Sequence, residues 1–455
     1  MNKKLMAVAV AGALAAPGLA LAQSSVTISG FIKASVNEIS VSGATPYTVG
    51  AGAGTSPRIG NTSEFRFIDD GPSRIRFTMR EDLGGGLYGL GQLEIRPTVN
   101  GSSGFGNTAG FGSTAGNSWV GIESSSLGSL RFGAIDRHYI LSANTALGGA
   151  LPNFAADPLT GYAYILPTSP GQTSGAPISA PPGAPSATVG VASQLSIGSA
   201  TRTRNQIGYD SPVIADAWRF NAGFGTRDSS GQGFNMANSV IPAGLAGAGG
   251  HVRTARVWFA GVNYDSGPIT AGISYYDTRE SQVTVAVTAV PGSYTGVVDT
   301  KQLRAMAAYT FPMGIRVGIT YDNFKAYNPL STTTIVAGVL TPTGVAGDVG
   351  KRTAWNIPIS YTTGPHGVQF LYARAGDDKI AGANTGASFW SLGYAYNFSK
   401  RTSIGAAYAR LTNKSAATYS AADTTGVANA YSTANSELYT GEDSNSWGIA
   451  VRHIF

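Results

Sequence analysis

A two-residue alternation of apolar and polar side chains recurs along this chain. At the carboxyl terminus, one face carries Trp447, Ile449, Val451, His453 and Phe455, and the other carries Ser446, Gly448, Ala450 and Arg452. Segments 72–82 and 388–398 repeat the pattern. A period of two is that of a β-strand with one apolar face, whereas an α-helix would mix the two sets of side chains. The alternation therefore predicts an all-β protein.

The segments are joined by two kinds of connection that alternate along the chain. Short, turn-like connections rich in Gly, Pro, Asp and Ser fall at 82–86, 125–129, 211–215, 265–268, 312–314, 363–367 and 399–402. Long connections rich in Gly, Ala, Ser and Thr fall near 39–70, 98–115, 137–200, 227–252, 281–298, 327–350, 376–386 and 414–443. Seven short and eight long connections require sixteen strands.

The alternation of connection lengths separates two antiparallel architectures. In a soluble sandwich or propeller, nothing requires short and long connections to alternate. A transmembrane β-barrel has short periplasmic turns, longer extracellular loops and an even number of strands, and its closure leaves no backbone group unpaired in lipid. Aromatic residues near segment ends suit its interfacial girdles: Tyr209, Trp218, Tyr264, Tyr309, Tyr321, Trp355, Tyr361, Tyr394 and Phe455. The sequence thus predicts a 16-stranded antiparallel transmembrane β-barrel.

The amino terminus has the features of a secretory signal. Lys3 and Lys4 precede an apolar run from Leu5 to about Leu19, and Ala20-Leu21-Ala22 supplies small residues at a cleavage site. The predicted domains are therefore a cleaved signal peptide, 1–22, and a barrel, 23–455. The absence of cysteine excludes disulfides and thiolate chemistry.

Five stretches carry a family resemblance. In chain order they read SSVTISGFIKASV, SRIRFTMREDLGGGLYGLGQLE, SWVGIESSSLGSLRFGAID, NQIGYDSP and VRHIF. Together they resemble the landmarks of Gram-negative general porins of the betaproteobacterial type. The resemblance implies a sixteen-stranded homotrimeric barrel in the outer membrane, a third loop folded inward as a constriction, and a terminal Phe that the barrel-assembly machinery reads.

The chain departs from this pattern at positions that carry charge in the pore. It has Lys33 where such porins commonly have an acid, and Gly208 and Ala134 where they commonly have Arg. The inward loop of these porins usually carries a Pro-acid-Phe-Gly motif, and the nearest match, Leu151 to Phe154, lacks the acid. These changes relocate charge in the pore and leave the fold unchanged.

Catalytic and cofactor chemistry finds no support in the sequence. No G-x-S-x-G or H-E-x-x-H motif occurs, and the histidines at 138, 251, 366 and 453 are dispersed. We therefore expect no enzymatic activity, no cofactor and no metal. The small basic excess is scattered along the chain, which argues against nucleic acid as a partner.

Passage through a pore requires a lumen of suitable width and field. Sixteen strands leave a water-filled interior. Strand parity places a basic set on the lumen face: Lys33, Arg74, Arg76, Arg80, Arg131, Arg202 and Arg204. Taken singly, each Arg is equally well interpreted as a pore residue or as its alternative, a solvated rim residue or a contact for lipopolysaccharide phosphate. The shared parity favours the pore, because an Arg facing lipid at the midplane costs about 2–4 kcal/mol.

The link 137–200 is the candidate constriction loop, with Asp136 and Asp157 as its acids. Acids on the loop facing arginines on the wall would set a transverse field, and the basic excess would favour anions. The Pro-, Ser- and Ala-rich part, 167–187, either narrows the mouth or is a surface excursion.

The predicted function is a general diffusion porin for small hydrophilic solutes, with a preference for inorganic or organic anions. A substrate-selective outer-membrane channel and an adhesin or structural barrel with a closed lumen are the alternatives. Outer-membrane lipid and lipopolysaccharide are its expected surroundings. A local expectation concerns Pro358, which falls inside an apparent strand and cannot donate to the ladder, so a β-bulge is predicted there.

Overall fold

The structure is a computed structural model that describes residues 25–42, 62–68, 73–95, 97, 117–136, 202–225, 256–279, 285–286, 293–294, 299–328, 333–336, 339–342, 347–380, 382–415, 417 and 443–455. All regular elements in these residues are β-strands. No helix long and apolar enough to span a membrane occurs in this part of the chain.

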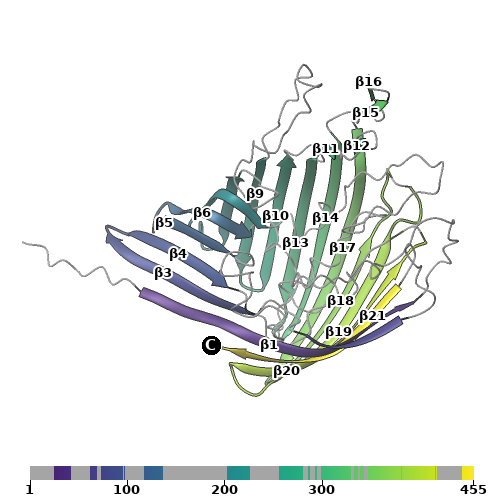
Figure 1. The fold of residues 1–455 in the computed structure, drawn as a ribbon. Coiled ribbons are helices and arrows are strands. Elements are labelled where there is room, and N and C mark those ends of the chain that lie inside the picture. The colour runs from purple at the N-terminus through teal and green to yellow at the C-terminus, as the bar shows by residue number, and fades with distance from the viewer. Residues whose placement is uncertain are drawn as a thin grey trace, which may run out of the picture.

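The strands that form the main sheet follow the chain almost in order. They are β1 (Ser25–Ser42), β2 (Thr62–Ile68), β3 (Arg74–Gly84), β4 (Leu87–Ile95), β5 (Ser118–Ser124), β6 (Gly128–Asp136), β7 (Arg202–Asp210), β8 (Trp218–Gly225), β9 (Arg256–Ser266), β10 (Ile269–Arg279), β13 (Asp299–Thr310), β14 (Ile315–Asn328), β17 (Gly347–Thr363), β18 (His366–Ala375), β19 (Ala387–Asn397), β20 (Thr402–Asn413) and β21 (Asp443–Ile454). Each pairs antiparallel with its neighbour in the ring (Figure 1).

The sheet closes on itself at β1. One edge of β1 pairs with β21, from Phe31 opposite Ile454 to Ser42 opposite Asp443. The other edge pairs first with β3 and then with β2, so these two strands share one position in the ring. The 17 strands of the sheet thus occupy sixteen positions, which confirms the predicted closed 16-stranded barrel. Gly30 and Phe455 exchange backbone N–H···O bonds of 3.1 Å that fix the carboxyl terminus to the first strand.

All seven predicted short connections are tight links between neighbouring strands. The β3–β4 turn shows why its sequence is glycine-rich, because Gly84, Gly85 and Gly86 have φ of +86°, +62° and +78°. Side chains rarely tolerate this left-handed region. The link 211–217 instead uses Ala215 and Asp216 at positive φ. We refer below to the short-turn end and, opposite it, the long-loop end of the barrel.

The long connections contain more strand than predicted. β1 and β2 extend into 39–70. A hairpin of β11 (Val285–Ala286) and β12 (Ser293–Tyr294) lies within 281–298. Another, of β15 (Thr333–Val336) and β16 (Val339–Pro342), lies within 327–350. Figure 1 shows both hairpins beyond the upper ends of β10 to β17, at the long-loop end.

The bulge predicted at Pro358 is wrong. β17 keeps the same register to β14 on both sides of this residue, from Val317 opposite Ile359 to Thr320 opposite Asn356. The ladder to β14 simply lapses at residues 357 and 358, while Pro358 stays opposite Leu371 of β18. The missing backbone N–H of Pro358 therefore interrupts the pairing of β17 with β14 locally, and no extra residue is inserted into the strand. The register shift of this pair lies instead between Ala326 and Tyr327.

The outward face of the barrel wall is apolar, and many side chains on its inward face are polar or charged. The outward face exposes large apolar side chains on almost every strand, such as Val120 at 64% and Val451 at 50%. The inward face carries the buried residues, and many of them are polar or charged, such as Gln206, Arg304 and Asn356. An apolar exterior around a polar interior is the arrangement expected for a barrel in lipid.

Aromatic side chains gather near both ends of the outward face. At the short-turn end, Trp218 contacts Tyr264 and Tyr309 contacts Phe311, with ring centroids 4.8 and 4.7 Å apart. Toward the long-loop end, Trp355 contacts Tyr372 and Trp390 contacts Tyr408, with centroids 5.6 and 5.2 Å apart. Two such belts mark the levels at which a barrel wall meets the membrane–water interfaces.

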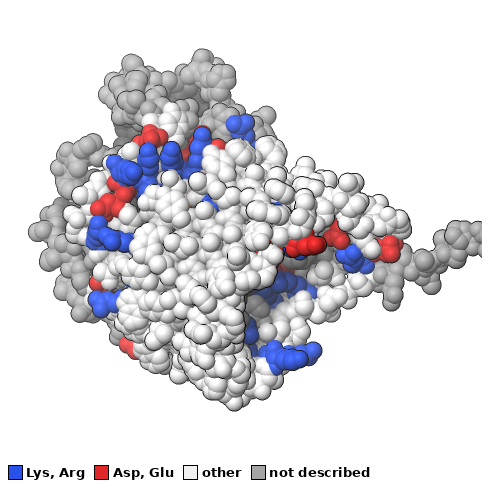
Figure 2. Space-filling view, turned by 180° about the vertical axis from the view of Figure 1, so that it is seen from behind, with Lys and Arg blue, Asp and Glu red and all other residues white. Residues whose placement is uncertain are grey.

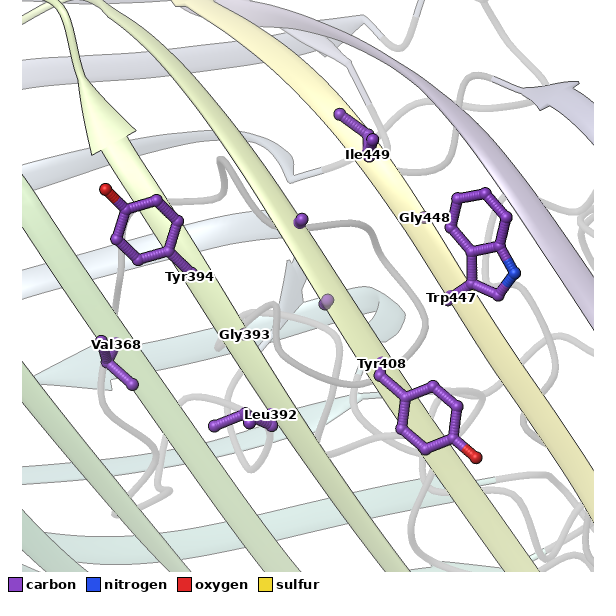
Figure 3. Close-up of a pocket in the computed structure, with 10 residues that line it drawn as sticks. Val368, Leu392, Gly393, Tyr394, Tyr408, Trp447, Gly448 and Ile449 are labelled. Atoms are coloured by element: carbon purple, nitrogen blue, oxygen red, sulfur yellow. The ribbon is translucent and has the colours of Figure 1, made fainter.

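A shallow apolar groove of about 560 Å³ crosses the outward face of β18–β21. Its floor consists of small residues, Gly393, Ala406, Ala407 and Gly448. In Figure 3 the side chains of Leu392, Tyr394, Tyr408, Trp447 and Ile449 stand around this bare patch of backbone. The groove therefore belongs to the lipid-facing surface and lies outside the lumen.

Candidate pore wall

The inward face of β3 to β5 carries two arginine–carboxylate pairs. Arg76 Nε donates to Glu94 Oε2 at 2.8 Å, and the Glu94 side chain is fully buried. Arg80 donates to Glu123 Oε1 at 3.0 Å, and its guanidinium lies 3.8 Å from the ring centroid of Tyr88. Both pairs join neighbouring or next-neighbouring strands, so pairing between strands fixes where their charges lie.

A second basic group lies beside the seam where the barrel closes. Lys33 and Arg74 are 1% and 6% exposed, and Arg74 stacks over the Phe31 ring at 5.0 Å. Lys33 is held in place through its backbone, which exchanges hydrogen bonds with Ser73 Oγ. It lies directly opposite Arg452 of β21 in the register. Sequence reasoning missed Arg452, although its parity opposite Val451 and His453 could have revealed it.

Arg131 occupies the inward face of β6. Its guanidinium stacks over Trp119 at 4.6 Å and lies 3.6 Å from Asp210 Oδ2 on β7. At the far end of the same strand pair, Asp136 lies opposite Arg202. The register shifts between Gly133 and Ile135, beside Asn205 at a φ of +50°.

The structure adds an inward-facing cluster on β13, β14 and β17 that sequence reasoning missed. Arg304 Nε donates to Asp322 Oδ2 at 2.8 Å, and Gln302 Nε2 donates to Asp322 Oδ1 at 3.0 Å. These residues are nearly inaccessible, with Arg304 at 0% and Asp322 at 1% exposure. Next to them, Arg352 stacks over Phe324 at 4.7 Å. The two-residue alternation that placed the earlier arginines also applies to these strands and could have found them.

Strands β18 to β20 have no charged residue at their described inward positions. On β18, β19 and β20 the inward positions are occupied by small, amide or apolar residues, including Gln369, Leu371, Phe389, Ser391 and Leu411. The wall thus has a basic sector, from the closing seam through β17, which an apolar cluster of Val257, Phe259 and Tyr276 interrupts on β9 and β10. The neutral sector on β18 to β20 lies between β17 and β21. Figure 2 shows basic side chains lining a hollow beside the broad uncharged outer surface.

Carboxylates of the barrel strands themselves also pair with wall arginines, in addition to the predicted partners Asp136 and Asp157. Four such carboxylates within the described residues come from neighbouring or next-neighbouring strands: Glu94, Glu123, Asp210 and Asp322. Asp136 is the last residue of β6. Asp157 and the rest of 137–200 lie outside the described residues, and so do residues 1–22. The backbones of Arg202 and Arg204 belong to β7, and their side chains are not described. The roles of these residues remain predictions.

The wall offers charge and hydrogen bonding to a passing solute. No group of three or more His, Cys, Asp or Glu side chains suited to a metal ion occurs among the described residues. The basic groups are fixed by ion pairs and by stacking on aromatic rings, which holds their charge in place. Such an arrangement can orient and conduct small polar solutes.

A closed sixteen-position barrel with a basic inner wall and an apolar outer wall defines the class of outer-membrane diffusion channels. The family model described as Gram-negative porin matches residues 7–416. The chain belongs to this porin family, and its location is the outer membrane, which it crosses with many strands.

Known relatives agree with this placement. The chain is 26% identical over 421 residues to an outer membrane porin protein of Bordetella pertussis, covering 89% of this chain and 92% of that protein. Its fold is similar to an anion-selective porin from Comamonas acidovorans, at 20% identity and a TM-score of 0.57, covering 95% of this chain and 100% of that one. It is also similar to OmpT of Vibrio cholerae, at 12% identity and a TM-score of 0.51, covering 95% and 98%.

Proposed function

We propose that this porin is a general diffusion channel for small hydrophilic solutes and that it prefers anions. The observation that carries the proposal is the basic sector of the inner wall, in which Lys33, Arg74 and Arg452 gather at the seam and Arg304 and Arg352 lie across β13–β17. Fixed positive charge lowers the energy of an anion in a narrow aqueous path. The similarity to a porin described as anion-selective also supports a preference for anions.

Reversal potentials across a planar bilayer test this selectivity. With a gradient of potassium chloride, we expect a potential that indicates greater permeability to chloride, together with ohmic single-channel steps. A reversal potential that favours potassium would contradict the anion preference. The absence of ohmic steps would favour the closed-lumen adhesin instead.

A substrate-selective channel is the alternative within the same class. Its support is the mixed character of the inner wall, where Arg352 stacks on Phe324 and offers both charge and an aromatic face. Saturable block of conductance by one solute, with no block by others of equal size, would favour this alternative. We expect a general diffusion porin to show no such saturation.

The finer features of the pore extend the same proposal. We infer that residues 1–22 are removed as a signal peptide, that 137–200 folds inward as the constriction, and that Asp136 and Asp157 face the wall arginines there. We further infer a homotrimer that contacts lipopolysaccharide. The porin family supports each of these. Mass spectrometry of the mature amino terminus and of the native assembly tests the first and the last.

A further inference from the structure

Glycines leave a stretch of the inner wall without side chains across β6, β7 and β8. In the register, Gly208 of β7 lies directly opposite Gly223 of β8, and Gly133 of β6 and Gly225 of β8 occupy the adjacent inward positions. We call these four residues the glycine floor. Arg131 of β6 lies directly opposite Gly208 on one side of the floor. Phe259 of β9 lies directly opposite Gly223 on the other side, so the floor separates a cation from an aromatic ring.

The cationic end of the floor is accessible from the lumen. The Arg131 side chain is 28% exposed, and its guanidinium is held over the Trp119 ring at 4.6 Å. Asp210 Oδ2 lies 3.6 Å from this guanidinium, a contact longer than a hydrogen bond. Because a guanidinium has five N–H donors in a planar fork, Arg131 can bind the carboxylate of a solute while Asp210 stays nearby.

The aromatic end of the floor is the Phe259 ring. This residue belongs to the buried apolar cluster with Val257 and Tyr276. A Cβ atom at position 223 would clash with the ring, which shows that the ring leans over Gly223 toward β6. The Cα atoms of Arg131 and Gly223 are two strand spacings apart, about 10 Å. This interval matches the length of one six-membered ring that carries a carboxylate group.

A buried amide lies beside the floor. Gln206 of β7 stands between Gly133 and Gly225 in the register and is the diagonal neighbour of Arg131, within reach of a long side chain. Its side chain is 1% exposed, and neither Oε1 nor Nε2 has a hydrogen-bond partner within the described part of the chain. Because a buried polar group without a partner is destabilising, a ligand atom that bonds to this amide gains binding free energy.

The backbone beside Gln206 is irregular. Asn205 has a φ of +50°, and the register between β6 and β7 shifts between Gly133 and Ile135. Such irregularities re-aim side chains and are frequent at ligand sites. The irregularity, the unpartnered amide and the glycine floor thus coincide at one place on the wall.

We propose that this part of the wall is a weak binding site for aromatic carboxylates, with benzoate as the simplest member. Arg131 and Gln206 Nε2 donate to the two carboxylate oxygens, and the ring of the solute lies over Gly208 against Phe259. The planar guanidinium matches a carboxylate, and two aromatic rings attract each other beyond their apolar contact. The site rests on the proposed anion preference and names one class of anion within it. Other solutes still pass, so general diffusion is retained.

The test compares two carboxylates of equal charge and similar size that differ in their rings. Benzoate has an aromatic ring, whereas the ring of cyclohexanecarboxylate is saturated. Reversal potentials across a planar bilayer, with one carboxylate on one side and chloride on the other, give the permeability of each carboxylate relative to chloride. For the unmodified full-length porin we expect benzoate to be about fivefold more permeant than cyclohexanecarboxylate.

Two variants each remove one part of the site. In Phe259→Leu the ratio of benzoate to cyclohexanecarboxylate permeability should fall to about one, because the aromatic contact is lost while the cluster stays apolar. In Gln206→Leu both carboxylates should become about threefold less permeant relative to chloride, since chloride offers no second oxygen for the amide. The matched controls Phe389→Leu and Gln369→Leu lie in the neutral sector, on β19 and β18, and should keep the values of the unmodified porin.

Equal permeability of the two carboxylates in the unmodified porin would overturn the proposal. Equal losses in Phe259→Leu and Phe389→Leu would overturn it too. If Phe259→Leu forms no channels, the ratio in the unmodified porin and the loss in Gln206→Leu decide. Failure of the site is distinct from failure of the anion preference, which the potassium chloride gradient tests alone. A porin that prefers chloride to potassium and passes both carboxylates equally would keep the proposed function and lose the site.

Discussion

At the scale of single residues, the wall arginines show two different ways of fixing a charge. Arg76 and Arg304 are fixed by carboxylates at 2.8 Å, whereas Arg74 and Arg352 lie over the rings of Phe31 and Phe324. An ion pair and an aromatic ring each restrict where a guanidinium group can lie. The guanidinium groups of these arginines therefore have fixed places on the lumen wall.

Replacement of Arg352 tests whether a stacked arginine contributes to the selectivity of the pore. In Arg352→Gln we expect the ratio of chloride to potassium permeability to fall by about two- to fivefold, because a net positive charge leaves the basic sector. Reversal potentials in a potassium chloride gradient measure the change. Lys400→Gln, in an exposed turn, is the control and should keep the original ratio. An unchanged ratio in Arg352→Gln would place this residue outside the conduction path.

Asp322 offers a test of stability at the same scale. In Asp322→Asn the buried Arg304 loses its carboxylate, and we expect the free energy of unfolding to fall by about 3 kcal/mol. Urea unfolding in lipid vesicles, followed by tryptophan fluorescence, measures this loss. Asn323→Ala, on the outward face of the same strand, should change stability by less than about 1 kcal/mol. Similar effects of both changes would argue against a structural role for the Arg304–Asp322 pair.

At the scale of elements, Asp377 near the start of the connection 376–386 binds both the other end of this connection and Lys414, the residue that follows β20. Lys414 Nζ donates to both carboxylate oxygens of Asp377, at 2.9 and 2.8 Å, and the Gly386 N–H donates to the same carboxylate at 2.8 Å. The hydrogen bond from Lys414 is the largest cause that lowers the pKa of Asp377 below its usual value of 3.8, and burial opposes it. The connection is thus ordered through a titratable group.

The order of this connection should therefore depend on pH. Because the folded-state pKa of Asp377 is lowered, the ion pair stabilises the fold above pH about 4 and is lost as the pH falls through the folded pKa. Hydrogen exchange of the amides of 376–386 should accelerate at pH 3 relative to pH 6, after correction for intrinsic rates. In Lys414→Met the exchange should already be fast at pH 6. Equal protection at both pH values in the unmodified porin would contradict the prediction.

The sequence predicts those features of the fold that depend only on residues close together in the chain. The short turns were predictable because Gly, Pro and Asp determine their own backbone conformation, as at Gly84 to Gly86. The division of one barrel position between β2 and β3, and the unbroken register past Pro358, depend on neighbouring strands. The side of each arginine could be read from its parity, but partners such as Glu94 and Asp322 follow from register, which sequence alone does not supply.

At the scale of the whole molecule, the side of the wall on which a charged residue lies decides whether its charge faces the lumen. Inward residues of β13–β17, such as Arg304, face the lumen, and outward residues next to inward positions, such as Lys325 beside Phe324, face away from it. A one-residue slip of any strand would exchange the two sets of side chains. Closure of the ring forbids such a slip, because β1 must pair with β21 and β3 at once. The fold thereby separates the charges of the pore from those of the surface.

The apolar outward face of the barrel must contact lipid, so a charged residue introduced there should destabilise the fold. Ile273 lies in the middle of β10 and is 43% exposed on the outward face. In Ile273→Arg we expect the free energy of unfolding in lipid vesicles to fall by about 2–4 kcal/mol, since the guanidinium would enter the hydrocarbon layer. Met313→Arg, in the β13–β14 turn and 67% exposed, should cost less than about 1 kcal/mol. If the exterior faced water, Ile273→Arg would be as harmless as Met313→Arg, so equal stabilities would contradict a lipid-facing barrel.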